Sequence, residues 1–157
     1  MTLIAKEYIR ILNGLEFDHL AALPYAALPI TTAISLLADW SMVYPRKESK
    51  EYGTKAHVEG VFKKGDKVVV IDDLITTGES KVEGIKKLES KGLRAQEVVV
   101  LINRSADGCR ALEEHGLKVH AVIDLTLILE YYGNHGKISS EMLSDIYDFL
   151  EDQRNEI

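Results

Sequence analysis

The sequence contains a single cysteine and three prolines and has no excess of basic residues, and each shortage excludes a class of protein. Cys109 can form neither an intramolecular disulfide nor a cysteine-based zinc cluster, which predicts a cytoplasmic protein. The 19 Lys and Arg residues against 25 Asp and Glu residues give a net charge of -6. Because no overall basic field exists to hold nucleic acid or an anionic membrane, we expect neither as a partner.

Several well-known motifs are also missing. The sequence contains no GxxxxGK[ST], GxGxxG or HExxH motif, which argues against a Walker-type phosphate loop, a dinucleotide-binding fingerprint and a dedicated metal site. Charged residues within the first ten positions are unlike a secretory signal peptide. The uncharged stretch 20–38 is long enough to suggest a membrane span, but Pro24 and Pro29 interrupt it.

What the sequence does contain is a pattern typical of one α/β domain spanning residues 1–157. The runs KVVVI at 67–71 and EVVVLI at 97–102 are typical of strands buried on both faces of a parallel sheet. Their alternation with segments of helical spacing predicts an open, mostly parallel sheet flanked by helices. We expect helices at 4–12, 30–38, 80–91, 110–115, 125–132 and 140–150, strands at 19–23, 41–44, 67–71, 97–102 and 118–123, and a long exposed loop at 45–60.

The most informative segment is VVVIDDLITTGES at 68–80, where a buried strand gives way to a helix. A helix N-terminus offers free N–H groups and a partial positive charge, which together bind phosphate, and Gly78 lets the backbone close around an anion. Carboxylates such as Asp72 and Asp73 repel phosphate but accept hydrogen bonds from ribose hydroxyls. The segment therefore predicts a ribose 5-phosphate site, and the simpler alternative is a strand-to-helix turn with Ser80 as its N-cap.

A local basic cluster stands out against the acidic total. Between positions 46 and 55, four basic residues oppose two acidic ones: Arg46, Lys47, Lys50 and Lys55 against Glu48 and Glu51. A basic loop next to a phosphate site is suited to closing over a pyrophosphate leaving group. A charged loop that is merely solvated is the alternative.

The segment at 68–80 resembles the phosphoribosyl pyrophosphate (PRPP) motif of the phosphoribosyltransferases. YPRKESKEYGT at 44–54 is similar to the catalytic loop of orotate phosphoribosyltransferases, LPYAALPI at 23–30 to their pyrophosphate loop, and LINR at 101–104 to the strand end that contacts orotate. The matches occur in family order over a core of about 17–131, followed by a C-terminal helix at 140–151. They most resemble the orotate phosphoribosyltransferase half of bifunctional UMP synthases.

The resemblance implies a type I phosphoribosyltransferase fold and a cytoplasmic homodimer of pyrimidine (UMP) biosynthesis that transfers the phosphoribosyl group of PRPP to orotate. It implies that Mg²⁺ arrives mainly with PRPP. It assigns the 5-phosphate to Thr76, Thr77, Gly78, Glu79 and Ser80, the ribose hydroxyls to Asp72 and Asp73, and the pyrophosphate to Arg46, Lys47, Lys50, Tyr25 and Ala26. It further implies that Arg104 contacts the base and that Lys50 acts across the dimer. Asp73, Arg46, Lys47 and Lys50 would be the catalytic residues.

Some positions depart from the family pattern. Ala26 stands where many bacterial members have Lys, Tyr52 where they have His, and Asn103 where an Asp precedes the arginine. The N-terminal hood that covers the base in the family has no counterpart here, so we expect PRPP binding to survive better than base selection. Two alternatives stay open: a PRPP-binding or regulatory module without catalysis, and a phosphoribosyltransferase for another base.

Overall fold

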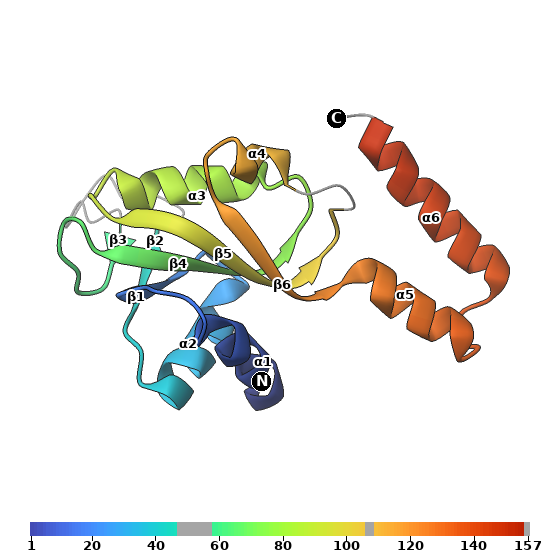
Figure 1. The fold of residues 1–157 in the computed structure, drawn as a ribbon, viewed down its shortest axis with the longest axis horizontal. Coiled ribbons are helices and arrows are strands. Elements are labelled where there is room, and N and C mark those ends of the chain that lie inside the picture. The colour runs from blue at the N-terminus through green and yellow to red at the C-terminus, as the bar shows by residue number, and fades with distance from the viewer. Residues whose placement is uncertain (47–57, 106–108, 156–157) are drawn as a thin grey trace. The chain divides into compact units, whose positions relative to one another are not determined.

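The structure is a computed structural model that describes residues 1–46, 58–105 and 109–155. By its internal contacts the chain forms two compact units, Met1–Val122 and Ile123–Ile157, which are described separately (Figure 1). The helices are α1 (Thr2–Leu12), α2 (Ala27–Ala38), α3 (Glu79–Glu89), α4 (Arg110–Glu113), α5 (Leu125–Asn134) and α6 (Ser140–Asn155). The strands are β1 (His19–Ala22), β2 (Met42–Pro45), β3 (Val58–Glu59), β4 (Lys67–Ile75), β5 (Arg94–Asn103) and β6 (Lys118–Asp124).

The strands form one sheet in the order β3-β2-β1-β4-β5-β6. The pairs β1–β2, β1–β4 and β4–β5 are parallel, whereas β3 runs antiparallel to β2. This arrangement confirms the predicted open, mostly parallel sheet. It also corrects one expectation, because the two-residue strand β3 lies inside the segment predicted as an exposed loop. A strand this short has no detectable period of its own and depends on its pairing with β2.

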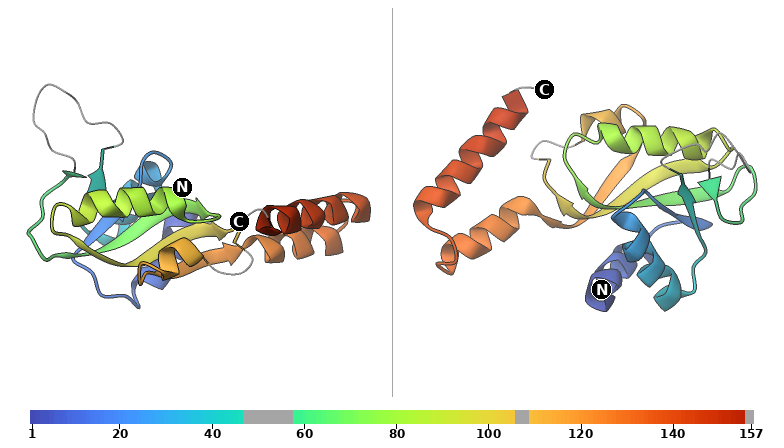
Figure 2. Two further views of the ribbon diagram at one scale, coloured as in Figure 1. Left: turned by 90° about the horizontal axis from the view of Figure 1, so that it is seen from above. Right: turned by 180° about the vertical axis from the view of Figure 1, so that it is seen from behind.

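Helices cover both faces of the sheet, α1 and α2 on one side and α3 and α4 on the other (Figures 1 and 2). Successive side chains of a strand point to opposite faces, and β4 follows this rule. Val68 and Val70 pack into the cluster beneath α3 and α4, and Val69 and Ile71 into the cluster beneath α1 and α2. This two-sided burial explains why the central strands are continuous β-branched runs.

The difference between predicted and observed boundaries that bears on the site concerns β4. The strand was expected to end at Ile71, but it extends to Ile75, so Asp72 and Asp73 are strand residues. The reason is that β4 stays paired with β5 as far as Ile75 and Asn103, which supports the backbone beyond the apolar run. The other predicted helices and strands are present, with ends shifted by a few residues.

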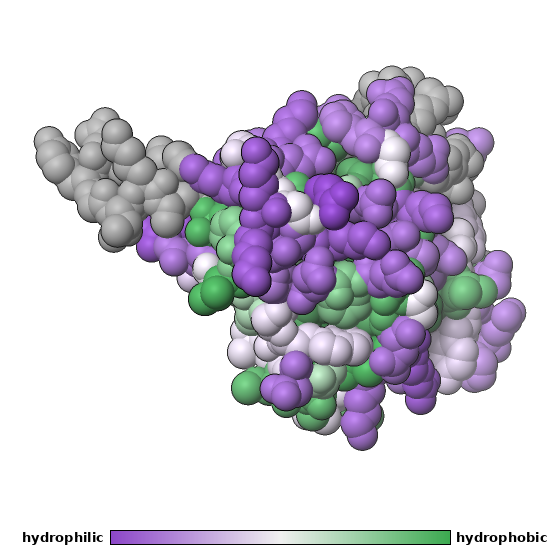
Figure 3. Space-filling model, turned by 60° about the vertical axis from the view of Figure 1, so that its left-hand side comes forward, coloured by the Kyte–Doolittle hydropathy of each residue, from purple (hydrophilic) through white to green (hydrophobic). Residues whose placement is uncertain are grey.

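The second unit contains α5 and α6, which confirms the helices expected at 125–132 and 140–150. Leu129 is buried, and the Leu143 side chain lies 3.0 Å from where a Cβ on Gly133 would be. No helix in the described parts of the chain is both long and apolar enough to cross a membrane. Hydrophilic side chains predominate on the face shown in Figure 3, in keeping with the mean hydropathy of -0.06.

Candidate functional site

The predicted site residues come from segments that follow four neighbouring strands. Tyr25 and Ala26 follow β1, Arg46 follows β2, the turn at 76–78 follows β4 and Arg104 follows β5. Because these four strands are parallel neighbours, their carboxyl ends meet at one edge of the sheet. This edge is where open α/β sheets bind their ligands. The structure therefore brings together residues that are far apart in the sequence.

The turn between β4 and α3 is built around Gly78, the N-cap of α3. Its φ is 84°, in the left-handed region that favours glycine. A Cβ at this position would lie 3.0 Å from the Leu112 side chain and 3.1 Å from Cys109 Sγ. The backbone N–H groups of Lys81 and Val82 donate to the Gly78 carbonyl oxygen at 3.0 and 3.2 Å. The residue at position 78 must thus be small and able to adopt a positive φ.

The exposed surface of this turn carries the predicted phosphate ligands. Thr76, Glu79 and Ser80 are exposed and Thr77 is half-buried. Because no side chain caps α3 and Ser80 lies within its first turn, the alternative in which Ser80 is the N-cap is wrong. The N–H groups that precede Lys81 in the first turn have no acceptor within the helix, and a helix N-terminus carries a partial positive charge. The turn therefore offers an anion both N–H donors and hydroxyl groups.

Cys109 packs beneath the turn. Its thiol donates to the Thr76 carbonyl oxygen at 3.3 Å, and the residue is only 2% exposed. Burial raises the pKa of the Cys109 thiol, so this sulfur is protonated at neutral pH and has the character of a packing group.

Asp72 is held from three directions at the end of β4. Its Oδ2 lies 2.7 Å from Lys81 Nζ of α3, and its Oδ1 accepts a hydrogen bond from the Asp73 N–H at 2.9 Å. Its backbone carbonyl accepts a bond of 2.6 Å from the Tyr8 hydroxyl of α1. Burial raises the pKa of the Asp72 carboxyl, and the Lys81 ammonium opposes that rise.

Asp73 is half-buried, and its Oδ1 accepts a hydrogen bond from the Leu74 N–H at 2.9 Å. The two adjacent carboxyl groups interact, because the side chain of Asp73 is one of the neighbours that raise the pKa of Asp72.

Of the predicted pyrophosphate ligands, the structure describes Arg46, Tyr25 and Ala26. The Arg46 guanidinium pairs with Glu59 of the neighbouring strand β3. Lys47, Lys50 and Tyr52 lie outside the described residues. Tyr25 follows a cis peptide bond after Pro24 and is 62% exposed, and Ala26 is exposed beside it.

The strand end at β5 positions Arg104. The Arg104 N–H donates to the Ile75 carbonyl oxygen at 2.8 Å, which ties it to the end of β4. Asn103 Oδ1 accepts from the N–H and the hydroxyl of Ser105 at 2.9 and 2.6 Å. The asparagine that departs from the family pattern therefore stabilises the local turn.

Sequence reasoning did not identify Tyr8 or Lys81 as site residues. A pattern for Lys81 was present, because Lys81, Ile85 and Leu88 are spaced i, i+4, i+7 and all three are buried. A lysine on an apolar helix face requires a carboxylate partner, and Asp72 and Asp73 were the candidates. Tyr8 lies on the buried face of α1, and the partner of its hydroxyl is a backbone atom that no sequence pattern reveals.

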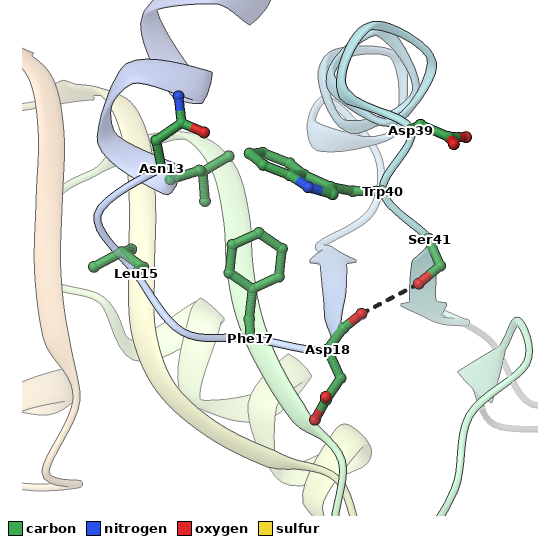
Figure 4. Close-up of a pocket in the computed structure, with 8 residues that line it drawn as sticks. Asn13, Leu15, Phe17, Asp18, Asp39, Trp40 and Ser41 are labelled. Atoms are coloured by element: carbon green, nitrogen blue, oxygen red, sulfur yellow. Dashed lines mark hydrogen bonds between the residues drawn. The ribbon is translucent and has the colours of Figure 1, made fainter.

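A separate cavity of about 330 Å³ lies at the opposite edge of the sheet, before β1 and β2 (Figure 4). The rings of Phe17 and Trp40 meet edge to face at 5.1 Å. The Asp18 carboxylate accepts the Lys67 N–H at 2.7 Å, and its carbonyl accepts the Ser41 hydroxyl at 3.2 Å. The cavity has no basic side chain in its lining, so it is a poor candidate for the phosphate site.

This chain is similar to known proteins in both sequence and fold. No family model matches the sequence. The orotate phosphoribosyltransferase of Caenorhabditis elegans is 44% identical over 68 residues, which is 43% of this chain and 30% of that protein. The UMP synthase structure of Leishmania donovani matches with a TM-score of 0.86 and 42% identity, covering 96% of this chain and 33% of that one.

A third match covers more of the other protein. The orotate phosphoribosyltransferase structure of Aeropyrum pernix matches with a TM-score of 0.73 and 29% identity, covering 84% of this chain and 75% of that one. The curated relatives are longer, and the matched segments cover between 16% and 39% of their length. This chain is therefore similar to orotate phosphoribosyltransferases in sequence, and it has the type I phosphoribosyltransferase fold.

Proposed function

We propose that this chain binds PRPP at the turn between β4 and α3 and transfers its phosphoribosyl group to orotate, giving orotidine 5'-phosphate and pyrophosphate. The observation that carries the proposal is the Gly78 turn, which places exposed hydroxyl groups and the N-terminus of α3 beside two carboxylates. The identity with orotate phosphoribosyltransferases supports orotate as the base.

The binding chemistry follows from the positions of the residues. Thr76, Thr77 and Ser80, with the first-turn N–H groups of α3, would hold the 5-phosphate. Asp73 and Asp72 would accept hydrogen bonds from the ribose hydroxyls, because an ionised carboxylate is an acceptor only. Displacement of pyrophosphate from the ribose C1 builds positive charge on the sugar and negative charge on the leaving group. Asp73 would stabilise the first and Arg46, with Lys47 and Lys50, the second.

The oxygen atoms at this edge of the sheet are suitable Mg²⁺ ligands, but few of them are available. They are hard oxygen atoms of carboxylates and hydroxyls, as the ion prefers, but Asp72 is already paired with Lys81. In the described residues no three His, Cys, Asp or Glu side chains converge on one point. We propose that the ion would be held mainly by the oxygens of PRPP and by water, with Asp73 as a protein carboxylate that could contact it. When bound, Mg²⁺ would neutralise charge on the pyrophosphate.

The base and the partner chain are also part of the proposal. Arg104, held at the end of β5, would pair with the orotate carboxylate, for which a guanidinium is well suited. We propose a cytoplasmic homodimer in which Lys50 of one chain completes the site of the other. The contact with orotate is supported by the family resemblance and by the position of Arg104 at the carboxyl ends of the strands. The homodimer is supported by the family resemblance.

The test is a turnover assay of the whole chain with PRPP, Mg²⁺ and a panel of bases: orotate, uracil, adenine and hypoxanthine. Of the four bases, we expect only orotate to cause release of pyrophosphate from PRPP. The Lys50→Ala variant should release no pyrophosphate with orotate. Tight PRPP binding with no turnover of any base would favour a binding or regulatory module. Turnover of a different base would favour a phosphoribosyltransferase of other specificity.

A further inference from the structure

Lys81 is the one charged residue that the described part of the chain buries. It lies in the first turn of α3, next to the predicted phosphate ligands, and its side chain is 8% exposed. Removing an ammonium group from water is costly unless a carboxylate and hydrogen bonds compensate it. A buried lysine beside a functional turn therefore requires an explanation in terms of its partner.

That partner is Asp72, whose position is fixed by three structural elements. Lys81 Nζ of α3 lies 2.7 Å from Oδ2, the Asp73 N–H of β4 donates to Oδ1, and the Tyr8 hydroxyl of α1 donates to the backbone oxygen. The Asp72 side chain is 13% exposed, so a small part of it reaches the edge where the ligand would bind. Its orientation therefore depends on Lys81, since the other two contacts hold its backbone and one oxygen.

We propose that Lys81 is a positioning residue for the ribose subsite, which rests on the proposed function. Its ammonium holds the Asp72 carboxylate in the orientation that receives a ribose hydroxyl. It also neutralises one of two adjacent negative charges. Without it, the Asp72 carboxylate would be a buried charge beside Asp73 with no counterion, a state that burial disfavours. Because Lys81 is buried, it acts on the substrate through Asp72 and not by contact.

The substitution Lys81→Met separates the effect of the Lys81 charge on Asp72 from the packing of the Lys81 side chain. Methionine keeps an unbranched apolar stem in line with Ile85 and Leu88 but removes the charge. The matched control is Lys86→Met, which removes the same charge from an exposed position of the same helix. Lys81→Arg keeps the positive charge and tests whether that charge restores PRPP binding.

The measurement is calorimetric titration of each folded variant with PRPP and Mg²⁺, at a temperature where circular dichroism shows native helix content. We expect the wild type and Lys86→Met to bind PRPP alike, Lys81→Met to bind about tenfold more weakly, and Lys81→Arg to recover part of the loss. In turnover assays, Lys81→Met should raise the KM for PRPP and leave the KM for orotate unchanged. Equal PRPP binding by Lys81→Met and the wild type would overturn the proposal.

A second variant covers the case in which Lys81→Met fails to fold. Lys81→Met combined with Asp72→Asn leaves no unpaired buried charge, so it should fold but still bind PRPP more weakly than the wild type. Wild-type affinity in this double variant would overturn the role of Asp72 in the ribose subsite, and with it the role of Lys81, which acts only through Asp72. Failure of the wild type to bind PRPP would overturn both proposals. PRPP binding without orotate turnover would overturn only the proposed transfer reaction. The PRPP affinities of Lys81→Met and the wild type would still decide the role of Lys81.

Discussion

The hydroxyl of Tyr8 donates a hydrogen bond of 2.6 Å to the backbone carbonyl of Asp72, although the two residues are 64 positions apart. This bond ties α1 to the end of β4, where the strand leaves the apolar core and enters the candidate site. Tyr8 is fully buried, so water cannot replace its hydroxyl if that group is lost. The first helix of the chain therefore contributes to the shape of the site.

Replacing Tyr8 with Phe should lower the free energy of unfolding by about 1–3 kcal/mol, because the Asp72 carbonyl loses a buried donor. Urea denaturation of the two proteins measures this difference. Tyr147→Phe is the control, since Tyr147 is exposed and its substitution should change stability by less than about 0.5 kcal/mol. A Tyr8→Phe variant as stable as the wild type would show that the bond contributes nothing.

The same residue gives a pH dependence. Burial, and then the nearby negative charge of Asp72, raise the pKa of the Tyr8 hydroxyl well above its usual value. A group whose pKa is raised by folding contributes stability that is complete below the unfolded pKa and is lost as pH rises through the folded pKa. We therefore expect the stability of the wild type to fall above about pH 10.

The comparison variant for this pH profile is again Tyr8→Phe. It should show a shallower decline above the same pH, because it has no hydroxyl to ionise at position 8. Urea midpoints measured at several alkaline pH values provide the data. Parallel declines in the two proteins would show that Tyr8 ionises equally in both the folded and unfolded states.

Gly78→Ala should damage the turn at the head of α3. The new Cβ would lie 3.0 Å from the Leu112 side chain and 3.1 Å from Cys109 Sγ. The alanine backbone would also be strained at a φ of 84°. Gly116→Ala is a matched control, because Gly116 has a φ of 70° but nothing within 4 Å of a Cβ. Strain alone costs about 1–3 kcal/mol.

Thermal unfolding and PRPP titration separate the two glycines. We expect both alanine variants to lose stability, Gly78→Ala more than Gly116→Ala, and only Gly78→Ala to lose PRPP affinity. Equal losses of stability at both positions, with PRPP binding intact, would mean that the packing around the Gly78 turn is not tight.

Cys109 offers a chemical test of the same packing. Because the thiol is buried and its pKa is raised, iodoacetamide at neutral pH should leave the native protein unmodified. In urea the single cysteine should react completely, giving one adduct by mass spectrometry. Rapid alkylation of the native protein would show that the layer beneath Thr76 is open to solvent.

Much of the fold could be predicted from local pattern alone. The β-branched runs of β4 and β5 and the apolar spacing of α1 and α3 reflect burial on sheet and helix faces, which composition and periodicity record directly. The extension of β4 to Ile75 could not be predicted in this way, because it depends on pairing with β5 and not on its own residues. The strand β3 was missed for the same reason.

The candidate site was predictable where it is contiguous in sequence and less so where it is assembled in space. The segment at 76–80, which is predicted to bind phosphate, is contiguous, so its glycine, its hydroxyls and its position before a helix could be recognised together. The contacts of Asp72 with Lys81 and Tyr8 join three elements, and only the fold reveals them. The pairing of Arg46 with Glu59 likewise requires the β2–β3 ladder.

Formation of orotidine 5'-phosphate is the reaction that we propose for this chain. The most direct measurement is chromatographic analysis of the chain incubated with PRPP, orotate and Mg²⁺, with orotidine 5'-phosphate and pyrophosphate quantified over time. We expect the two products to appear in equal amounts, at a rate proportional to protein concentration, and neither to form when PRPP or orotate is omitted. Protein that binds PRPP yet forms no orotidine 5'-phosphate would contradict this proposal.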